Sequence, residues 1–171
     1  MTREQFSSDM PDQRRQLEQR RNLLSDAIDL RQEEFQKLNR VQSPETVHLV
    51  DAKRLEIARL RAELWETEQQ LGLISTSGEE GRTFALMKTA DETELGALER
   101  MMVLYDQRQG LTSGDHRYQT IEDQLNHERL TIYQAKLAAL GVSDPFFEIQ
   151  TVRQQIDYLR QRLGEQPRGG Q

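Results

Sequence analysis

Residues 143–164 read SDPFFEIQTVRQQIDYLRQRLG, and this stretch decides the fold class that the sequence predicts. Its apolar side chains recur at spacings of 3, 4, 3 and 4 residues, at Ile149, Val152, Ile156, Leu159 and Leu163. This spacing predicts an α-helix with one apolar face, a coiled-coil-like seam of two heptads. Asp144 and Pro145 suit the cap and the first turn of that helix, and Gly164 suits its end.

A second helix is predicted directly upstream, over about 115–140, and Gly141 ends it. Its apolar positions lie on one side: Tyr118, Ile121, Leu125, Ile132, Leu137 and Leu140. The connection to the next helix is short, so the two helices are expected to pair antiparallel as a hairpin. Residues 90–163 are therefore expected to hold a middle helix, near 90–109, followed by this second hairpin.

Residues 11–72 predict a first hairpin of the same kind. A long helix is expected over about 11–41, with Leu23 and Leu30 widening its apolar face. Ser43 suits the cap of the next helix. In that helix, apolar residues recur every seven positions, at Val50, Ile57, Leu64 and Leu71. The link between the two helices is about two residues long, which favours antiparallel pairing.

The remaining segments carry weaker helical patterns. Residues 1–10 are expected to form a flexible N-terminus, residues 164–171 a disordered tail, and residues 73–89 a linker that includes, as one option, a short helix. Thr89 and Glu92 have the spacing of a capping box, which predicts that the middle helix starts near residue 90. The sequence thus predicts an all-α, elongated bundle of about five helices, built from antiparallel helical hairpins.

A shift of 99 residues superposes part of the first hairpin on the second. Lys37-Leu38 then falls on Lys136-Leu137, and Arg61 falls on Arg160. Two interpretations stay open: a duplicated hairpin, or two heptad-patterned helices that match whenever they are slid into phase. Both predict hairpins that bury one apolar stripe.

The composition limits the class of protein. Of 171 residues, 35% are hydrophobic and 30% charged, the net charge is −6, and there is no cysteine. Even with glycine counted, the apolar share falls below the ~45–50% of ordinary globular chains, which favours an elongated body or one that completes its core with another chain. An acidic chain with interspersed charges is not expected to bind nucleic acid. No apolar run approaches the ~20 residues that span a bilayer, so we expect a cytoplasmic protein without membrane contact.

No motif for catalysis, cofactor binding or metal binding rises above chance in this sequence. Glu45 and His48 have the Glu-x-x-His spacing of di-iron bundles, but only one copy exists, and a capping acid beside an exposed histidine is the simpler explanation. Asp123 and His127 share a helical face, which is typical of a surface charge pair. We therefore expect no catalytic residue, no cofactor and no metal, and we expect that the chain is not an enzyme.

Four arginines near the start of the first helix are candidates for partner binding: Arg14, Arg15, Arg20 and Arg21. Arg14 and Arg21 lie seven residues apart on one stripe, where guanidinium groups can hold phosphates or an acidic partner. The alternative is a solvated helix face, since acidic residues lie nearby.

Large apolar side chains supply the other candidates. Trp65, Phe146 and Phe147 can anchor a partner, and the two phenylalanines point about 100° apart, so a narrow seam does not easily cover both. Met101 and Met102 are candidates because methionine surfaces adapt to varied partners. The alternative is that these side chains are buried within the chain itself.

These features favour a non-catalytic coiled-coil protein, a scaffold or an adaptor, that mediates protein–protein interaction or self-assembly as a homo-oligomer. One alternative is a small helical chaperone or regulatory subunit that holds a client helix in a groove. A nucleic-acid-associated protein is the least favoured of the three hypotheses.

Overall fold

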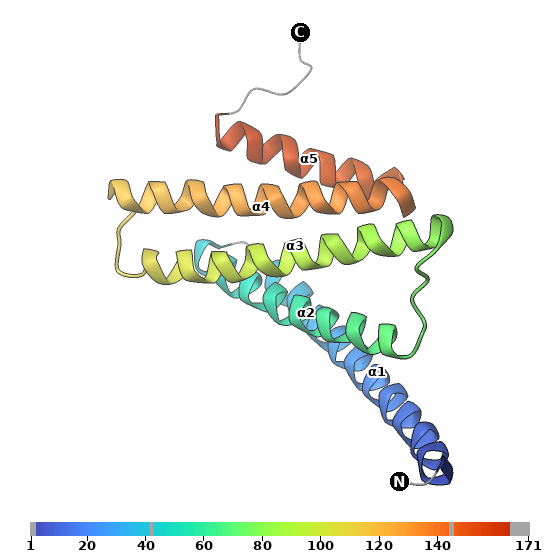
Figure 1. The fold of residues 1–171 in the computed structure, drawn as a ribbon. Coiled ribbons are helices and arrows are strands. Elements are labelled where there is room, and N and C mark those ends of the chain that lie inside the picture. The colour runs from blue at the N-terminus through green and yellow to red at the C-terminus, as the bar shows by residue number, and fades with distance from the viewer. Residues whose placement is uncertain (1–2, 42, 144–145, 165–171) are drawn as a thin grey trace. The chain divides into compact units, whose positions relative to one another are not determined.

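The computed structural model describes the backbone of residues 3–41, 43–143 and 146–164, and the side chains of residues 11–41, 43, 45–140 and 151–164. The described backbone forms five helices and no strand, so the prediction of an all-α protein with about five helices is confirmed (Figure 1). The helices are α1 (Arg3–Asn39), α2 (Pro44–Gln70), α3 (Gly78–Arg108), α4 (His116–Ser143) and α5 (Phe146–Arg162). The chain divides into two compact units, residues 1–81 and 82–171.

In the first unit, α1 and α2 form an antiparallel hairpin. Cross-helix ion pairs show the direction, because Arg20 meets Glu63 at 3.5 Å and Arg31 meets Glu56 at 3.2 Å. The partner number falls as the number on α1 rises, as antiparallel pairing requires. The buried apolar side chains of this unit come from both helices and the residue after them: Leu24, Ile28, Leu55, Ile57, Ala58 and Leu71. The predicted first hairpin is therefore present.

The start of α2 confirms the cap predicted from the sequence. The Ser43 hydroxyl accepts a hydrogen bond from the Thr46 backbone N–H at 3.3 Å, and the Thr46 hydroxyl accepts one from the Ser43 N–H at 3.1 Å. This reciprocal box satisfies two backbone donors that the first helical turn leaves without an internal partner. Pro44 follows in the first turn, where its missing N–H costs nothing.

Two helix starts differ from the prediction. The first helix begins at Arg3 rather than near residue 11, and it continues through Pro11, which was expected to open it. A proline within a helix removes one internal hydrogen bond, but residues 3–10 contain no other helix breaker, so the helix extends past it. Residues 1–2 lie outside the described part of the chain.

The third helix begins at Gly78 rather than near residue 90, so most of the predicted linker is helical. Glu79 and Glu80 suit the positive end of the helix dipole. Gly81 allows the preceding loop to lie close, because a Cβ at that position would be 2.6 Å from the Thr76 carbonyl carbon. These features favour an early start, and the capping-box spacing of Thr89 and Glu92 is not used as a helix start.

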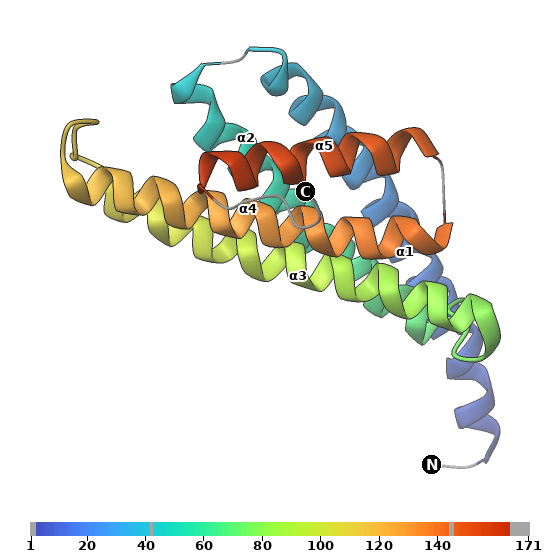
Figure 2. The same cartoon turned by 90° about the horizontal axis from the view of Figure 1, so that it is seen from above.

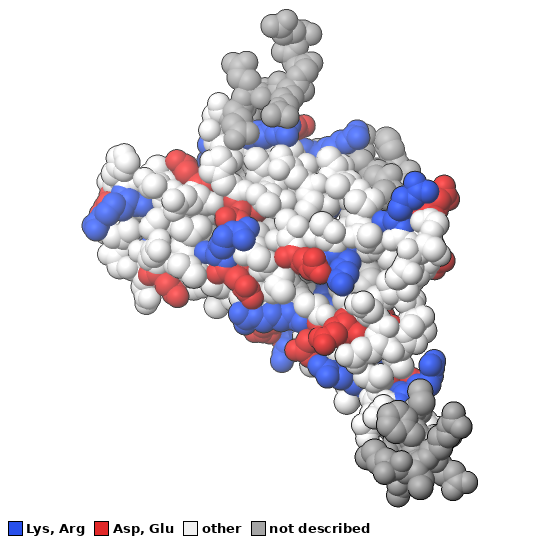
Figure 3. Space-filling model, in the orientation of Figure 1, with Lys and Arg blue, Asp and Glu red and all other residues white. Residues whose placement is uncertain are grey.

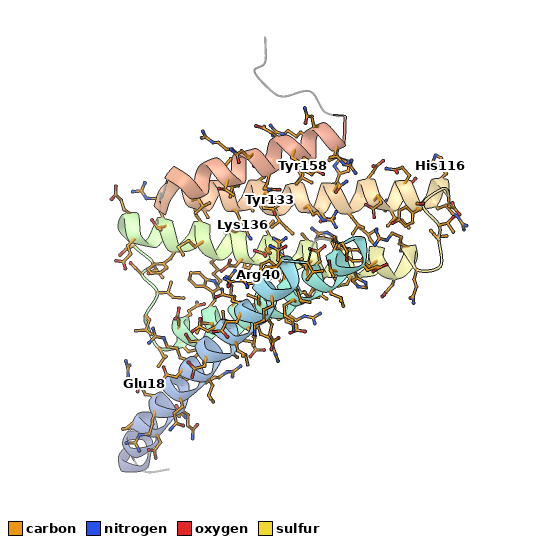
Figure 4. The ribbon with its side chains drawn as sticks, turned by 180° about the vertical axis from the view of Figure 1, so that it is seen from behind. Glu18, Arg40, His116, Tyr133, Lys136 and Tyr158 are labelled. Atoms are coloured by element: carbon orange, nitrogen blue, oxygen red, sulfur yellow. The ribbon has the colours of Figure 1, made fainter. Side chains whose placement is uncertain are left out.

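In the second unit, α3 and α4 lie side by side and antiparallel in both ribbon views (Figures 1 and 2). Lys136, labelled on α4 in Figure 4, meets the buried carboxylate of Glu94 at 3.3 Å. Towards the other end of the pair, Arg108 and Glu122 form an ion pair across the same two helices. The middle helix is thus a full partner of α4.

The α4–α5 hairpin confirms the seam from which the fold was predicted. Val152, Ile156 and Leu159 are buried against Leu130, and four partly buried side chains surround this cluster: Tyr133, Leu137, Leu140 and Leu163. Ile149 belongs to α5, but its side chain lies outside the described residues, as do Asp144 and Pro145. Tyr133 on α4 and Tyr158 on α5 are marked in Figure 4, and only Tyr158 is strongly exposed.

Candidate partner-binding surfaces

Three of the four candidate arginines on α1 hold carboxylates. Arg14 pairs with Glu18 at 3.1 Å within α1, Arg20 pairs with Glu63, and Arg21 meets Glu68 on α2 at 3.3 Å. All four arginines are exposed. Exposed pairs of this kind contribute about 0–1 kcal/mol each, and an incoming anion must compete with the carboxylate already bound. These ion pairs therefore favour a role of the arginines within the hairpin over the binding of a phosphate-bearing partner.

The large apolar candidates fall into three groups. Met101 is completely buried, so it belongs to the interior rather than to the surface predicted for it. Trp65 and Met102 are half-buried, so each offers only part of its surface to a partner. The side chains of Phe146 and Phe147 lie outside the described residues.

Met101 is buried together with the other residues that share its face of α3. The buried positions of α3 are Ala90, Glu94, Ala97, Leu98, Met101 and Tyr105. Met101 follows Leu98 by three residues and precedes Tyr105 by four, so these three side chains share one face. Met102 is one residue further along, so its side chain points about 100° away from that of Met101.

Two leucines on α1 are exposed although the sequence predicts them to widen its buried face. Leu23 is 70% exposed and Leu30 is 54% exposed, whereas Leu24 and Ile28 on the same helix are buried. Within its unit α1 packs on α2 alone. One helix covers only a narrow strip of another, so the side of α1 that carries Leu23 and Leu30 stays uncovered by α2. Leu23 and Leu30 are seven residues apart, so they stand on one stripe about 10.5 Å apart along the helix axis.

A shallow groove of about 490 Å³ runs between α3 and α4. Its lining combines apolar, amide and charged side chains: Arg100, Val103, Leu104, Gln107, Gln124, His127 and Glu128. Arg100 donates two hydrogen bonds of 2.9 Å to the Glu128 carboxylate, and this bidentate contact raises the pKa of the Arg100 guanidinium. The charges of that pair are therefore mutually satisfied, and exposed Val103 is the principal apolar contact that the groove offers.

An arginine–tyrosine cluster fixes the α3–α4 pair near its connecting turn. The Arg108 guanidinium lies 5.0 Å from the ring centroid of Tyr105 and 5.1 Å from that of Tyr118, and it pairs with Glu122. Arg129 donates a 2.7 Å hydrogen bond to the Tyr105 hydroxyl. Cation–π contacts and charge-assisted hydrogen bonds of this kind orient both helices, so we assign the cluster to structure rather than to ligand binding.

The three histidines stand at positions 48, 116 and 127, on α2 and α4. His116, marked at the start of α4 in Figure 4, shares a 3.3 Å contact with the Thr120 hydroxyl. In the part of the chain that the structure describes, no group of three or more His, Asp or Glu side chains is arranged to hold a metal ion. Figure 3 shows basic and acidic side chains interspersed on the face in view, without a large field of one sign.

The ion pair of Glu34 with Lys53 links α1 to α2 and makes the stability of this hairpin depend on pH. The Lys53 ammonium lies 2.8 Å from the Glu34 carboxylate, and the Lys53 side chain is only 17% exposed. The hydrogen bond from Lys53, with Arg31 adding to it, lowers the pKa of Glu34, and hydrogen bonds to Glu34 and Glu56 raise the pKa of Lys53. Because the pKa of Glu34 is lowered, the stability that this ion pair contributes is lost as the pH falls through that pKa. Because the pKa of Lys53 is raised, the same contribution is lost as the pH rises through that pKa.

We expect the free energy of unfolding to have a plateau near neutral pH, with falls below about pH 4 and above about pH 10. Denaturant unfolding of the full chain at a series of pH values measures this. Glu34→Gln lowers the plateau and removes its share of the acid-side fall, because that share depends on protonation of Glu34. An acid limb identical in shape for the wild-type chain and this variant would contradict the prediction.

No protein-family model, curated protein or solved structure matches this chain. None of the described helices combines the length and the apolar character that a bilayer-spanning segment needs. The candidate surfaces are therefore judged on their own geometry and chemistry.

Proposed function

We propose that this chain is a non-catalytic interaction protein, a scaffold or an adaptor, whose coiled-coil-like hairpins bind other protein chains. The observation that carries the proposal is the exposed pair Leu23 and Leu30 on α1. They lie beside the seam that α2 already fills, so the hairpin does not use these two side chains for its own packing. A cytoplasmic location belongs to the same proposal and is supported by the cysteine-free composition.

The energetics favour a covered leucine face. Burying an exposed leucine side chain contributes about 1.5–3 kcal/mol relative to leaving it in water. Two leucines at heptad spacing match the way in which one helix packs on another, with side chains from each entering gaps on its partner. A second copy or another protein can supply that helix, and both belong to the proposed function.

The test replaces the leucine face and leaves the hairpin seam intact. We expect Leu23→Gln/Leu30→Gln to keep its helicity by circular dichroism and to lose binding to co-purifying proteins. Absolute mass by light scattering over a hundredfold range of concentration shows whether a second copy also uses this face. Leu49→Gln/Tyr158→Gln is the matched control, because it changes two exposed large hydrophobic residues away from both candidate surfaces. Equal association in the wild-type chain and the leucine variant would contradict the use of this face.

The second candidate function is a helical chaperone or regulatory subunit that holds a client helix in the α3–α4 groove. Exposed Val103 in that groove supports it. The methionines that suggested this function from the sequence support it less, since Met101 is buried. Client binding that is lost in Val103→Gln and kept in Leu23→Gln/Leu30→Gln would favour this alternative.

Nucleic-acid binding through the arginines of α1 is the third hypothesis and has the least support. Arg14, Arg20 and Arg21 each contact a carboxylate. A titration at low salt with duplex and single-stranded DNA and RNA tests it, and the absence of a binding signal would remove it.

A further inference from the structure

The two edges of the exposed leucine face on α1 differ in their charges. On the edge that borders α2, Arg20 pairs with Glu63, Arg31 with Glu56, and Glu34 with Lys53. These charges are satisfied within the hairpin, and a partner gains little from approaching them.

The outer edge of the same face carries exposed carboxylates. Asp26 and Glu33 each follow one of the two leucines by three residues, and Asp29 lies between them in the sequence. All three are exposed, and the ion pairs of α1 within the described residues do not involve them. Between Leu23 and Glu33 every charge on this edge is therefore negative, and positive charge returns one turn further on, at the exposed Lys37.

We infer that the Leu23–Leu30 face binds an amphipathic helix whose apolar stripe is flanked by lysine or arginine side chains. The inference rests on the proposed function and names the chemistry of the partner. The leucines supply the apolar contact, and the carboxylates of Asp26, Asp29 and Glu33 pair with the basic flank of the incoming helix. In helix pairs, the residues that flank the apolar stripe select the partner in this way.

A second copy of the chain fits this face less well than a basic helix. In antiparallel pairing with the leucines of one copy facing those of the other, the two outer edges meet and Asp26 comes close to Asp26 of the copy. In parallel pairing the outer edge of one copy meets the inner edge of the other, which its own α2 already covers. Like charges and an occupied edge both disfavour self-association through this stripe.

The size of the face predicts a transient complex. Ala27 lies between the two leucines on the same side of α1 and lets a partner backbone approach closely. Two leucine layers bury far less than the roughly 800 Å² per partner of a stable complex. The carboxylates then contribute a large part of the selectivity, and this part weakens as salt screens the charges.

The experiment uses the full chain and two designed, fluorescently labelled helical peptides. Both peptides carry the same leucine stripe, and its flanks are lysine in one and glutamate in the other. We expect fluorescence anisotropy at low salt to show about tenfold tighter binding of the lysine-flanked peptide, a ratio that falls towards one at high salt. In the variant Asp26→Asn/Asp29→Asn/Glu33→Gln, the two peptides are expected to bind with equal affinity.

Two further variants separate this surface from general charge attraction. Leu23→Gln/Leu30→Gln is expected to abolish binding of both peptides. The control Glu80→Gln/Asp106→Asn/Asp157→Asn removes the same charge at exposed positions elsewhere and is expected to keep the ratio.

Three results would overturn the inference. Binding of the lysine-flanked peptide that persists in the leucine variant shows attraction to the acidic chain as a whole. Equal affinity for the two peptides, lost in the leucine variant, overturns the charge selectivity and leaves the proposed function standing. If neither peptide binds, the inference fails, and the light-scattering and binding measurements with the leucine variant decide the proposed function separately.

Discussion

Replacing Ile156 and Leu159 by aspartate is expected to unfold the α4–α5 hairpin. Both side chains are 4% exposed and belong to the buried cluster around Leu130 and Val152. Removing a buried aliphatic side chain of this size costs about 2–5 kcal/mol, and burying a carboxylate without a partner costs more still. Two such changes together approach the total stability of about 5–15 kcal/mol that a domain possesses.

Circular dichroism and denaturant unfolding measure this loss. We expect lower helicity in buffer and the disappearance of part of the unfolding transition in Ile156→Asp/Leu159→Asp. The matched control is Gln155→Asp/Tyr158→Asp, which places the same charges at exposed positions of the same helix. Unchanged helicity and an unchanged transition in the first variant would mean that this stripe is not a packed seam.

Leu125→Ala is expected to destabilise the second unit by about 2–5 kcal/mol. Leu125 on α4 is completely buried, together with Leu98, Met101 and Ile132. Truncation to alanine loses the transfer free energy of the removed atoms and leaves a cavity that the two flanking helices only partly close. The helical propensity of alanine is high, so local helix stability does not explain a loss.

The midpoint of denaturant unfolding reports this change if its slope stays constant. Leu125→Met is the matched control, because it keeps the volume and is expected to cost less than about 1.5 kcal/mol. Similar midpoints for the alanine and methionine variants would contradict the burial of Leu125.

Some elements of the fold were predictable because their signals are local. The apolar spacing of Val152, Ile156 and Leu159 places them on one face in any helix, and the structure buries all three. The cap formed by Ser43 depends on atoms within four residues, so the sequence alone identifies it. The start of α3 was missed because Gly81 permits a close approach of the Thr76 carbonyl carbon, a contact that spacing does not reveal.

The candidate surface was less predictable because exposure depends on which helices meet. Leu23 and Leu30 have the spacing of core residues, and the structure leaves them exposed. For Met101 the sequence leaves partner binding and burial open, and the structure buries it. Neighbouring residues such as Leu23 and Leu24, or Met101 and Met102, point about 100° apart around the helix. Because both members of each pair are apolar, the sequence does not show which of them faces the core.

The sequence by itself determined that the described chain is all-α, that its helices carry apolar stripes, and where several of them begin and end. These properties follow from periodicity and capping, which act within one or two turns. Only the tertiary structure decided that α4 pairs with α3 on one face and with α5 on another, and that the leucine face of α1 stays open. The physical reason is that a stripe records the side of a helix that avoids water, whereas the helix that covers it is set by packing between segments far apart in the chain.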